Sequence, residues 1–280
     1  MNNDLKIIEK NPAYLIEMLL FFTALFFLIA LIIFILTYFK RYRRINEELL
    51  KADYQKLIDD VLFAHLFIEE NIAEDVEQAF RFNFDSHLLF RKVAVKSVVA
   101  LQQNYSGAFK AKLELFFEKY NLTRYSIQKL ESKKWYEQIE GIRDLSNLNY
   151  QPAFEKIKSC LTHKNQLVQE EVLIAILKMR GINELILQKD SNIFLNDWIQ
   201  SNIIFTIKNN KINEVDNLID LLESNNESMQ LLGVRIINYF HDSSYTDKLI
   251  TLEKQTTCLK LKVEINVTVD YLNNYYTTKL

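Results

Sequence analysis

The sequence predicts an all-α protein, in which a single N-terminal transmembrane helix is followed by an α-solenoid of helical hairpins. Three observations lead to this fold class. An uncharged apolar run of 22 residues extends from Met18 to Phe39. The chain has only four Gly and two Pro in 280 residues, which favours long helices over a strand-rich fold with many tight turns. Beyond the run, apolar residues recur at helical spacing in units of slightly more than 30 residues.

These patterns divide the chain into four parts. Residues 1–14 form a short N-terminal tail and residues 15–39 the transmembrane helix. Residues 40–84 form a basic juxtamembrane segment and a stalk with the first helices. Residues 85–280 form the solenoid, which contains an insert at 105–132.

The apolar run is long enough to cross a bilayer. At ~1.5 Å per helical residue it spans roughly 33 Å. A cleaved signal peptide is the alternative, but its apolar core would have about 7–15 residues and a small-residue cleavage site would follow. Here the run is longer and a basic cluster follows it, so we expect a permanent anchor.

The distribution of basic residues around the run predicts its orientation. The N-terminal flank carries Lys6 and Lys10, whereas five basic residues lie between Lys40 and Lys51. Since the more basic flank stays in the cytoplasm, we expect a single-pass protein of the inner (cytoplasmic) membrane with a cytoplasmic C-terminal domain. Binding of anionic lipid is a secondary role, at about 1 kcal/mol per basic residue. The membrane-orienting residues are Lys40, Arg41, Arg43 and Arg44.

Two further helices are expected outside the repeated units. Ile45 to Phe67 has a helical apolar pattern, and no Gly or Pro occurs from Lys40 to Ser106, so this segment continues from the membrane span as a stalk or first solenoid helix. A second amphipathic helix fills the insert, between Ser106-Gly107 and Asn121. Its apolar residues are Phe109, Leu113, Phe116, Phe117 and Tyr120.

One helix pattern then repeats along the chain. Val168, Val172 and Ala175 are spaced by four and seven residues, which places them on one helix face. The leading residues of the successive units are 33, 30, 31 and 32 residues apart, and an earlier unit precedes them by 45. The other triples are Phe90, Ala94, Ser97; Trp135, Ile139, Ile142; Trp198, Asn202, Phe205; Met229, Gly233, Ile236; and Leu261, Ile265, Thr268.

A shorter amphipathic segment and a polar turn precede at least two of these helices. The turns are His163 to Gln166 and Ser224 to Glu227. The unit is therefore helix, turn, helix. A single hairpin of this kind cannot bury its apolar face, so the units must stack into a solenoid.

These residues resemble the HEAT repeat family. Leu161 to Leu177 and Leu222 to Ile237 follow the second half of that repeat, and Arg91 follows the leading Phe90 as in the family. Gln169 and Gln230 replace the usual Arg in later units, which puts the family's buried Asp–Arg ladder in doubt. The related armadillo-type class is an alternative label, and membrane-anchored bacterial HEAT-repeat proteins are similar. The resemblance implies an interaction scaffold with a grooved surface and no chemistry.

The last unit carries a conflicting signal. Leu259 to Tyr271 alternates apolar and polar residues as a strand does. The repeat register makes the same segment a helix with Leu261, Ile265 and Thr268 inward. A lone strand at the end of a solenoid would leave its backbone groups unpaired, so we predict a helix.

Catalytic and metal-binding patterns are absent from the sequence. It has no phosphate-binding, dinucleotide-binding, zinc-protease or nucleophile-elbow motif. His65 and Glu69, one turn apart, are too few ligands for a metal site. Trp135 and Trp198 occupy leading apolar positions, where core packing is the expected role. We therefore expect no catalytic residues, no metal, no cofactor and no small-molecule substrate.

The function we expect is that of a non-catalytic scaffold or adaptor that binds a protein partner, as an accessory to a membrane-associated or envelope-associated complex. The alternative is an enzyme or nucleic-acid-binding module on a HEAT-like solenoid, which would need a clustered acid–base set or a basic groove. The net charge of −2 gives no reason to expect nucleic acid. The outward residues expected to contact the partner are Arg91, Lys92, Lys96, Gln169, Glu170, Gln230 and Arg235.

Overall fold

The chain is all-helical in the computed structural model, which is described for residues 12–67, 73–105, 107–212, 215 and 217–277. No described residue lies in a strand, and the described part contains fourteen α-helices, α2 to α15. The predicted all-α class is therefore confirmed. Lys6 and Lys10, which entered the orientation argument, lie outside the described residues.

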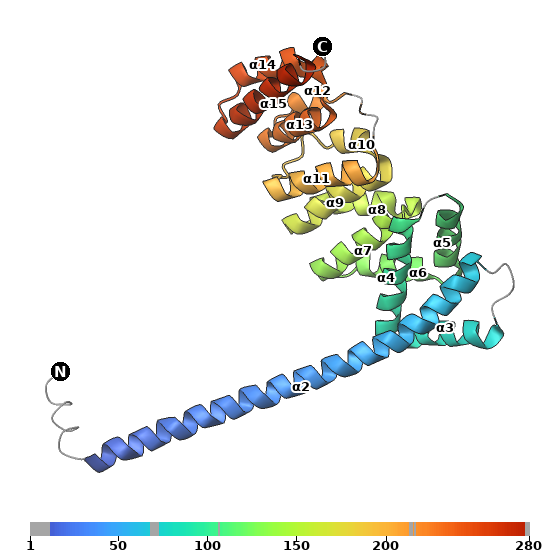
Figure 1. Ribbon diagram of the computed structural model, residues 1–280, viewed down its shortest axis with the longest axis vertical. Coiled ribbons are helices and arrows are strands. Elements are labelled where there is room, and N and C mark those ends of the chain that lie inside the picture. Colours follow the sequence, from blue (N-terminus) through green and yellow to red (C-terminus); the bar gives the residue numbers. More distant parts are fainter. Residues whose placement is uncertain (1–11, 68–72, 106, 213–214, 216, 278–280) are drawn as a thin grey trace.

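Helix α2 (Pro12–Phe67) is one uninterrupted helix of 56 residues. It projects away from the other helices (Figure 1), and every side chain from Tyr14 to Asp53 is exposed. By length and composition its apolar part can cross a membrane. The Thr23 and Thr37 hydroxyls each donate to the carbonyl four residues earlier at 2.7 Å, so these polar groups are satisfied within the helix. The apolar run and the segment from Ile45 to Phe67 therefore lie in one continuous helix.

The C-terminal part of α2 belongs to a first group of helices with an aromatic core. Phe80 lies edge-on to Phe90 and Phe116, with ring centres 5.1 and 5.8 Å apart, a geometry that aromatic pairs favour. The predicted insert helix is present as α5, which buries Leu113, Phe116 and Phe117. The other helices of this group are α3 (Glu74–Ser86), α4 (Leu88–Asn104), α5 (Ala108–Lys119) and α6 (Leu122–Leu130).

The remaining helices follow one another in sequence order along the body (Figure 1). Helices α7, α9, α11, α13 and α15 contact each other in that order, and α8, α10, α12 and α14 pack beside them. The bounds are α7 (Trp135–Asn147), α8 (Phe154–Ser159), α9 (Gln166–Arg180), α10 (Ile182–Ile186), α11 (Asp197–Asn209), α12 (Ile219–Leu222), α13 (Glu227–Phe240), α14 (Thr246–Gln255) and α15 (Leu259–Thr277).

Helix α9 is the centre of this second core. Val168, Val172 and Ala175 are fully buried, as the repeat register predicts. The side chain of Asn165 caps the helix by accepting from the Leu167 amide, and Gly181 ends it with a φ of +82°. Because α7, α8, α10 and α11 surround α9, it is apolar on nearly all sides rather than along one stripe.

The predicted register is wrong by one residue in α11. Trp198 and Phe205 are exposed, whereas Ile199 and Ile203 are fully buried. The helix carries two apolar stripes, so periodicity alone could not tell which of them faces the core. In α7, Ile139 and Ile142 are buried as predicted, but Trp135, at the first position of the helix, is exposed.

The segment with strand-like alternation is helical. Leu261 and Ile265 of α15 are buried against the preceding helices, while Leu259, Val263 and Val267 are exposed on another face. Two apolar faces on one helix produce an apolar residue at almost every second position. The prediction of a helix is confirmed, and the alternation is explained without a strand.

Candidate functional site

The basic residues predicted on α4 border a wide cavity next to the stalk. Lys92 and Lys96 are exposed and line a cavity of about 910 Å³ between α2 and α4. The same cavity is lined by Lys51 and by the carboxylates of Glu47, Glu48 and Asp59. The cavity therefore carries charges of both signs and is not purely basic. Arg91 lies apart from it, half-buried, with its guanidinium 5.6 Å from the ring centre of Tyr125.

Three of the other predicted contact residues are Gln169, Glu170 and Gln230. One of them is buried, and the other two form hydrogen bonds within their own repeat unit. Glu170 is only 3% exposed, so its predicted outward position is wrong: α9 is covered on nearly all sides. The Gln169 side chain donates to the His163 carbonyl at 2.7 Å, and Gln230 donates to the Ser224 carbonyl at 2.8 Å. Each glutamine thus ties a helix to the turn before it, at equivalent places in two units.

Arg235 bridges three helices. Its Nη1 donates to Asp197 Oδ1 of α11 at 2.9 Å, and its Nη2 donates to Glu264 Oε2 of α15 at 3.2 Å. A second donation from Nη1 reaches Gln200 Oε1 at 3.1 Å. Hydrogen bonds from Lys260 and Arg235 lower the pKa of Asp197. The Arg235 side chain, predicted to contact a partner, therefore links α13 to its neighbours.

Side-chain amides of Asn226 and Gln200 bond to carbonyls of the segment that precedes α11. Asn226 Nδ2 donates to the carbonyls of Ser191 and Ile193, both at 2.8 Å. Gln200, fully buried, donates to the Leu195 carbonyl at 2.9 Å. Buried carbonyls outside a helix need such donors. Asn226 lies in the predicted turn Ser224 to Glu227, but the sequence indicates neither its bonds nor the role of Gln200, because a single Asn or Gln carries no periodic signal.

An aromatic pocket of about 290 Å³ lies where the first turns of α7, α9 and α11 meet. Its rim carries Trp135, Tyr136, Leu167 and Trp198, and all four are exposed. The expectation that Trp135 and Trp198 pack in the core is therefore wrong. Tyr136, Leu167 and Trp198 are each the second residue of their helix, so three successive units present an apolar side chain at the same place.

Carboxylates line the same aromatic pocket. Glu171 is paired with Arg143, whose Nη2 lies 2.6 Å from its Oε2, and Glu140 lies 3.4 Å from Lys129 Nζ. Glu170 accepts a hydrogen bond from Gln166 Nε2 at 2.9 Å. Among the described residues, no Lys, Arg or His side chain lies within 4 Å of its carboxylate. Burial raises the pKa of Glu170, and the hydrogen bond from Gln166 opposes this only in part.

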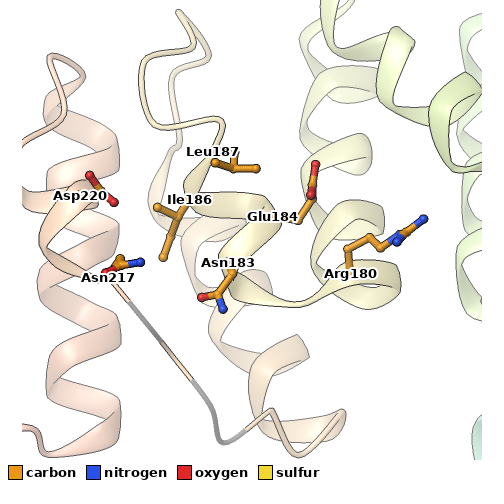
Figure 2. Close-up of a pocket in the computed structure, with 7 residues that line it drawn as sticks. All are labelled: Arg180, Asn183, Glu184, Ile186, Leu187, Asn217 and Asp220. Carbon is orange, nitrogen blue, oxygen red and sulfur yellow. The ribbon is translucent and has the colours of Figure 1, made fainter.

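A third cavity, of about 410 Å³, lies between α10 and the start of α12 (Figure 2). Its charged side chains are already engaged: Glu184 accepts from Lys158 at 2.6 Å and Asp220 from Lys189 at 2.6 Å. In Figure 2 the Arg180 side chain points away from Asn217 and Asp220, and its guanidinium lies 4.8 Å from the ring centre of Phe154. The polar groups therefore do not converge on a common point.

The described residues contain no group of three or more His, Cys, Asp or Glu side chains placed to hold a metal ion. His65, one of the two residues weighed as a metal pair, has its Nε2 3.1 Å from the Lys112 carbonyl. Glu69, the other, lies outside the described residues. Desolvation lowers the pKa of His65, which favours a neutral ring.

Comparison with known proteins does not assign the chain. No family model, curated protein or solved structure matches it. Its function is therefore inferred from the contacts and surfaces described above.

Proposed function

We propose that this protein is a single-pass inner-membrane scaffold whose cytoplasmic domain binds a protein partner without catalysing a reaction. In this proposal the helices from α4 to α15 form an α-solenoid of HEAT-like hairpins, and α2 anchors it. The partner occupies the grooved face of the solenoid, and the assembly serves a membrane-associated or envelope-associated complex.

The observation that carries the proposal is the ordered row of helices α7, α9, α11, α13 and α15. Each member contacts the next, and their leading residues recur at near-even intervals. In the other row, which consists of α8, α10, α12 and α14, neighbouring helices contact each other less. The largest contact in that row is between α12 and α14. In this proposal the row from α7 to α15 lies on the inside of the curved stack, where curvature would make it an extended binding surface.

The anchor is supported by α2 and by the charge beside it. The exposed apolar side chains from Leu15 to Phe39 have no protein partner among the described residues, and an exposed apolar surface of that size requires lipid or another protein. Lys40, Arg41, Arg43 and Arg44 follow directly and are exposed. This asymmetry supports a cytoplasmic body.

Site-specific photocrosslinking in native membranes tests the scaffold. A photoreactive amino acid is placed at Lys92 beside the stalk cavity or at Leu167 in the row of first turns. The matched control is Glu155, an exposed position on α8 in the other row. We expect Lys92 and Leu167 to trap a protein of the same mass and Glu155 to trap none. If neither Lys92 nor Leu167 traps a discrete product, the scaffold proposal is wrong.

Topology needs a separate test. A fluorescent protein that matures in the cytoplasm, fused after Leu280, should fluoresce, and a reporter active only outside the cytoplasm should be silent. Replacing Lys40, Arg41, Arg43 and Arg44 together by Gln should mix the two orientations. The opposite reporter pattern in the unmodified chain would overturn the proposed orientation.

A further inference from the structure

The aromatic pocket combines exposed aromatic side chains with a buried carboxylate. Its walls are large aromatic side chains, of which Trp135 is 43% exposed and Trp198 62% exposed. Its depth contains a carboxylate, Glu170, that is almost completely buried. Exposed indoles and a buried charge are each unfavourable in the free protein, so their occurrence in one cavity indicates a bound group that offsets both.

The electrostatics of the pocket are those of a cation site. Of its carboxylates, Glu171 already has Arg143 and Glu140 has Lys129. Glu170 has only the neutral amide of Gln166, whose Nε2 also donates to the Phe194 carbonyl at 3.1 Å. A negative charge removed from water without a cationic partner is costly. A cation from outside the chain would supply the missing partner.

The aromatic rim favours the same kind of ligand. Indole faces attract ammonium and guanidinium groups, most strongly where water is excluded, and the flat guanidinium also stacks on aromatic rings. The pocket spans the first turns of three successive helices, so it opens along the row that the scaffold proposal assigns to the partner. A volume of about 290 Å³ suits one long side chain rather than a folded domain.

We propose that this aromatic pocket binds a Lys or Arg side chain from an extended segment of the partner protein, with the charge on Glu170 and the aliphatic stem against Trp135, Leu167 and Trp198. This inference rests on the proposed scaffold function and names the chemistry of the partner. Glu170 determines specificity for a cation, while the aromatic side chains supply apolar contact area.

Intrinsic tryptophan fluorescence can report binding in this pocket. Trp135 and Trp198 are its only two tryptophans, and both line the aromatic pocket. The full chain in detergent micelles is titrated with the peptide acetyl-Gly-Ala-Arg-Ala-Gly-amide while tryptophan fluorescence is recorded. We expect a saturable change with the Arg peptide and with its Lys counterpart. The citrulline peptide, which has nearly the same shape without the charge, should bind at least about tenfold more weakly.

Two variants complete the experiment. Glu170→Gln keeps the size of the side chain and removes its charge, and it should weaken Arg-peptide binding about tenfold while the spectrum of the free protein stays the same. Glu155→Gln, the same exchange on exposed α8, should bind as the unmodified chain does. The proposal is overturned if the Arg peptide produces no change, if citrulline or norleucine peptides bind equally well, or if Glu170→Gln binds normally.

The peptide titration tests the cation pocket and the crosslinking experiment tests the scaffold, so either proposal can be rejected without the other. Arg-peptide binding without any crosslinked partner would retain the cation pocket and reject the scaffold. A partner trapped from Leu167 equally well in the unmodified chain and in Glu170→Gln would retain the scaffold and reject the pocket as its recognition element.

Discussion

Gly141 of α7 lies directly against the backbone of Leu130 at the end of α6. A Cβ atom on Gly141 would lie 2.5 Å from the Leu130 amide nitrogen and 2.8 Å from the Ser126 carbonyl oxygen. Neither backbone atom can move without moving α6. The close approach of these two helices therefore depends on the absence of a side chain at this position. Helix α6 contributes Leu122 and Tyr125 to the aromatic core around α2 and Leu130 to the second core.

Gly141→Ala should destabilise the protein by about 1–3 kcal/mol, because overpacking forces α6 and α7 apart. In a free helix the same exchange would stabilise by up to about 1 kcal/mol, so the sign itself is informative. Urea denaturation of the solubilised chain, followed by circular dichroism, measures the change. Glu155→Ala on exposed α8 should change stability by less than about 0.5 kcal/mol. A stabilising Gly141→Ala would contradict the α6–α7 contact.

Val172→Asp should destabilise the protein by more than about 4 kcal/mol, because it places an unpaired charge at a fully buried position of α9. The control is Lys164→Asp in the exposed turn before that helix, which should have little effect. Gln169 is no control of this kind, since Gln169→Asp would remove its hydrogen bond to the His163 carbonyl. Similar losses at Val172 and Lys164 in thermal denaturation would show that α9 is not the centre of the core.

Glu170→Gln should stabilise the free protein at neutral pH, because it removes a buried charge that no described cation balances. Burial raises the folded-state pKa of Glu170 above its unfolded value, so the folded state is penalised above the folded pKa, and the penalty is relieved as pH falls through it. The advantage of the variant should therefore shrink on acidification. Glu140, Arg143 and Glu171 line the same pocket in both proteins, so the difference between the two stability curves isolates Glu170. If Glu170→Gln is less stable than the unmodified chain at pH 7, the buried charge of Glu170 does not destabilise the free protein.

Arg235→Ala should cost about 1–3 kcal/mol, because it removes charge-assisted hydrogen bonds between α13 and both neighbouring helices. The control variant is Arg124→Ala, which makes the same exchange at an exposed position of α6 and should change stability little. Loss of partner binding in Arg235→Ala would then follow from altered helix packing rather than from a lost contact. If chemical denaturation finds the two variants equally stable, the bridge contributes nothing measurable.

The sequence by itself determined the helical fold class and the long apolar helix near the N-terminus, which by length and composition can cross a membrane. Apolar spacing of four and seven residues identifies a helix wherever it falls, and the apolar length of α2 depends on no other part of the chain. The same reasoning placed Val168, Met229 and Leu261 correctly, since each of these leading residues is buried. It also anticipated that Lys92 and Lys96 would be exposed on α4.

Only the tertiary structure decided which of two apolar faces is buried and which polar residues are enclosed. In α11 the faces led by Trp198 and by Ile199 both carry large apolar residues, and the choice depends on the surfaces that α9 and α13 present. Glu170 is buried for a similar reason: its helix is covered on nearly all sides, which no property of Glu170 or its immediate neighbours signals. Amphipathicity describes a helix relative to itself, whereas burial depends on what surrounds it. The aromatic pocket, built from three helices far apart in the chain, exists only after they have packed.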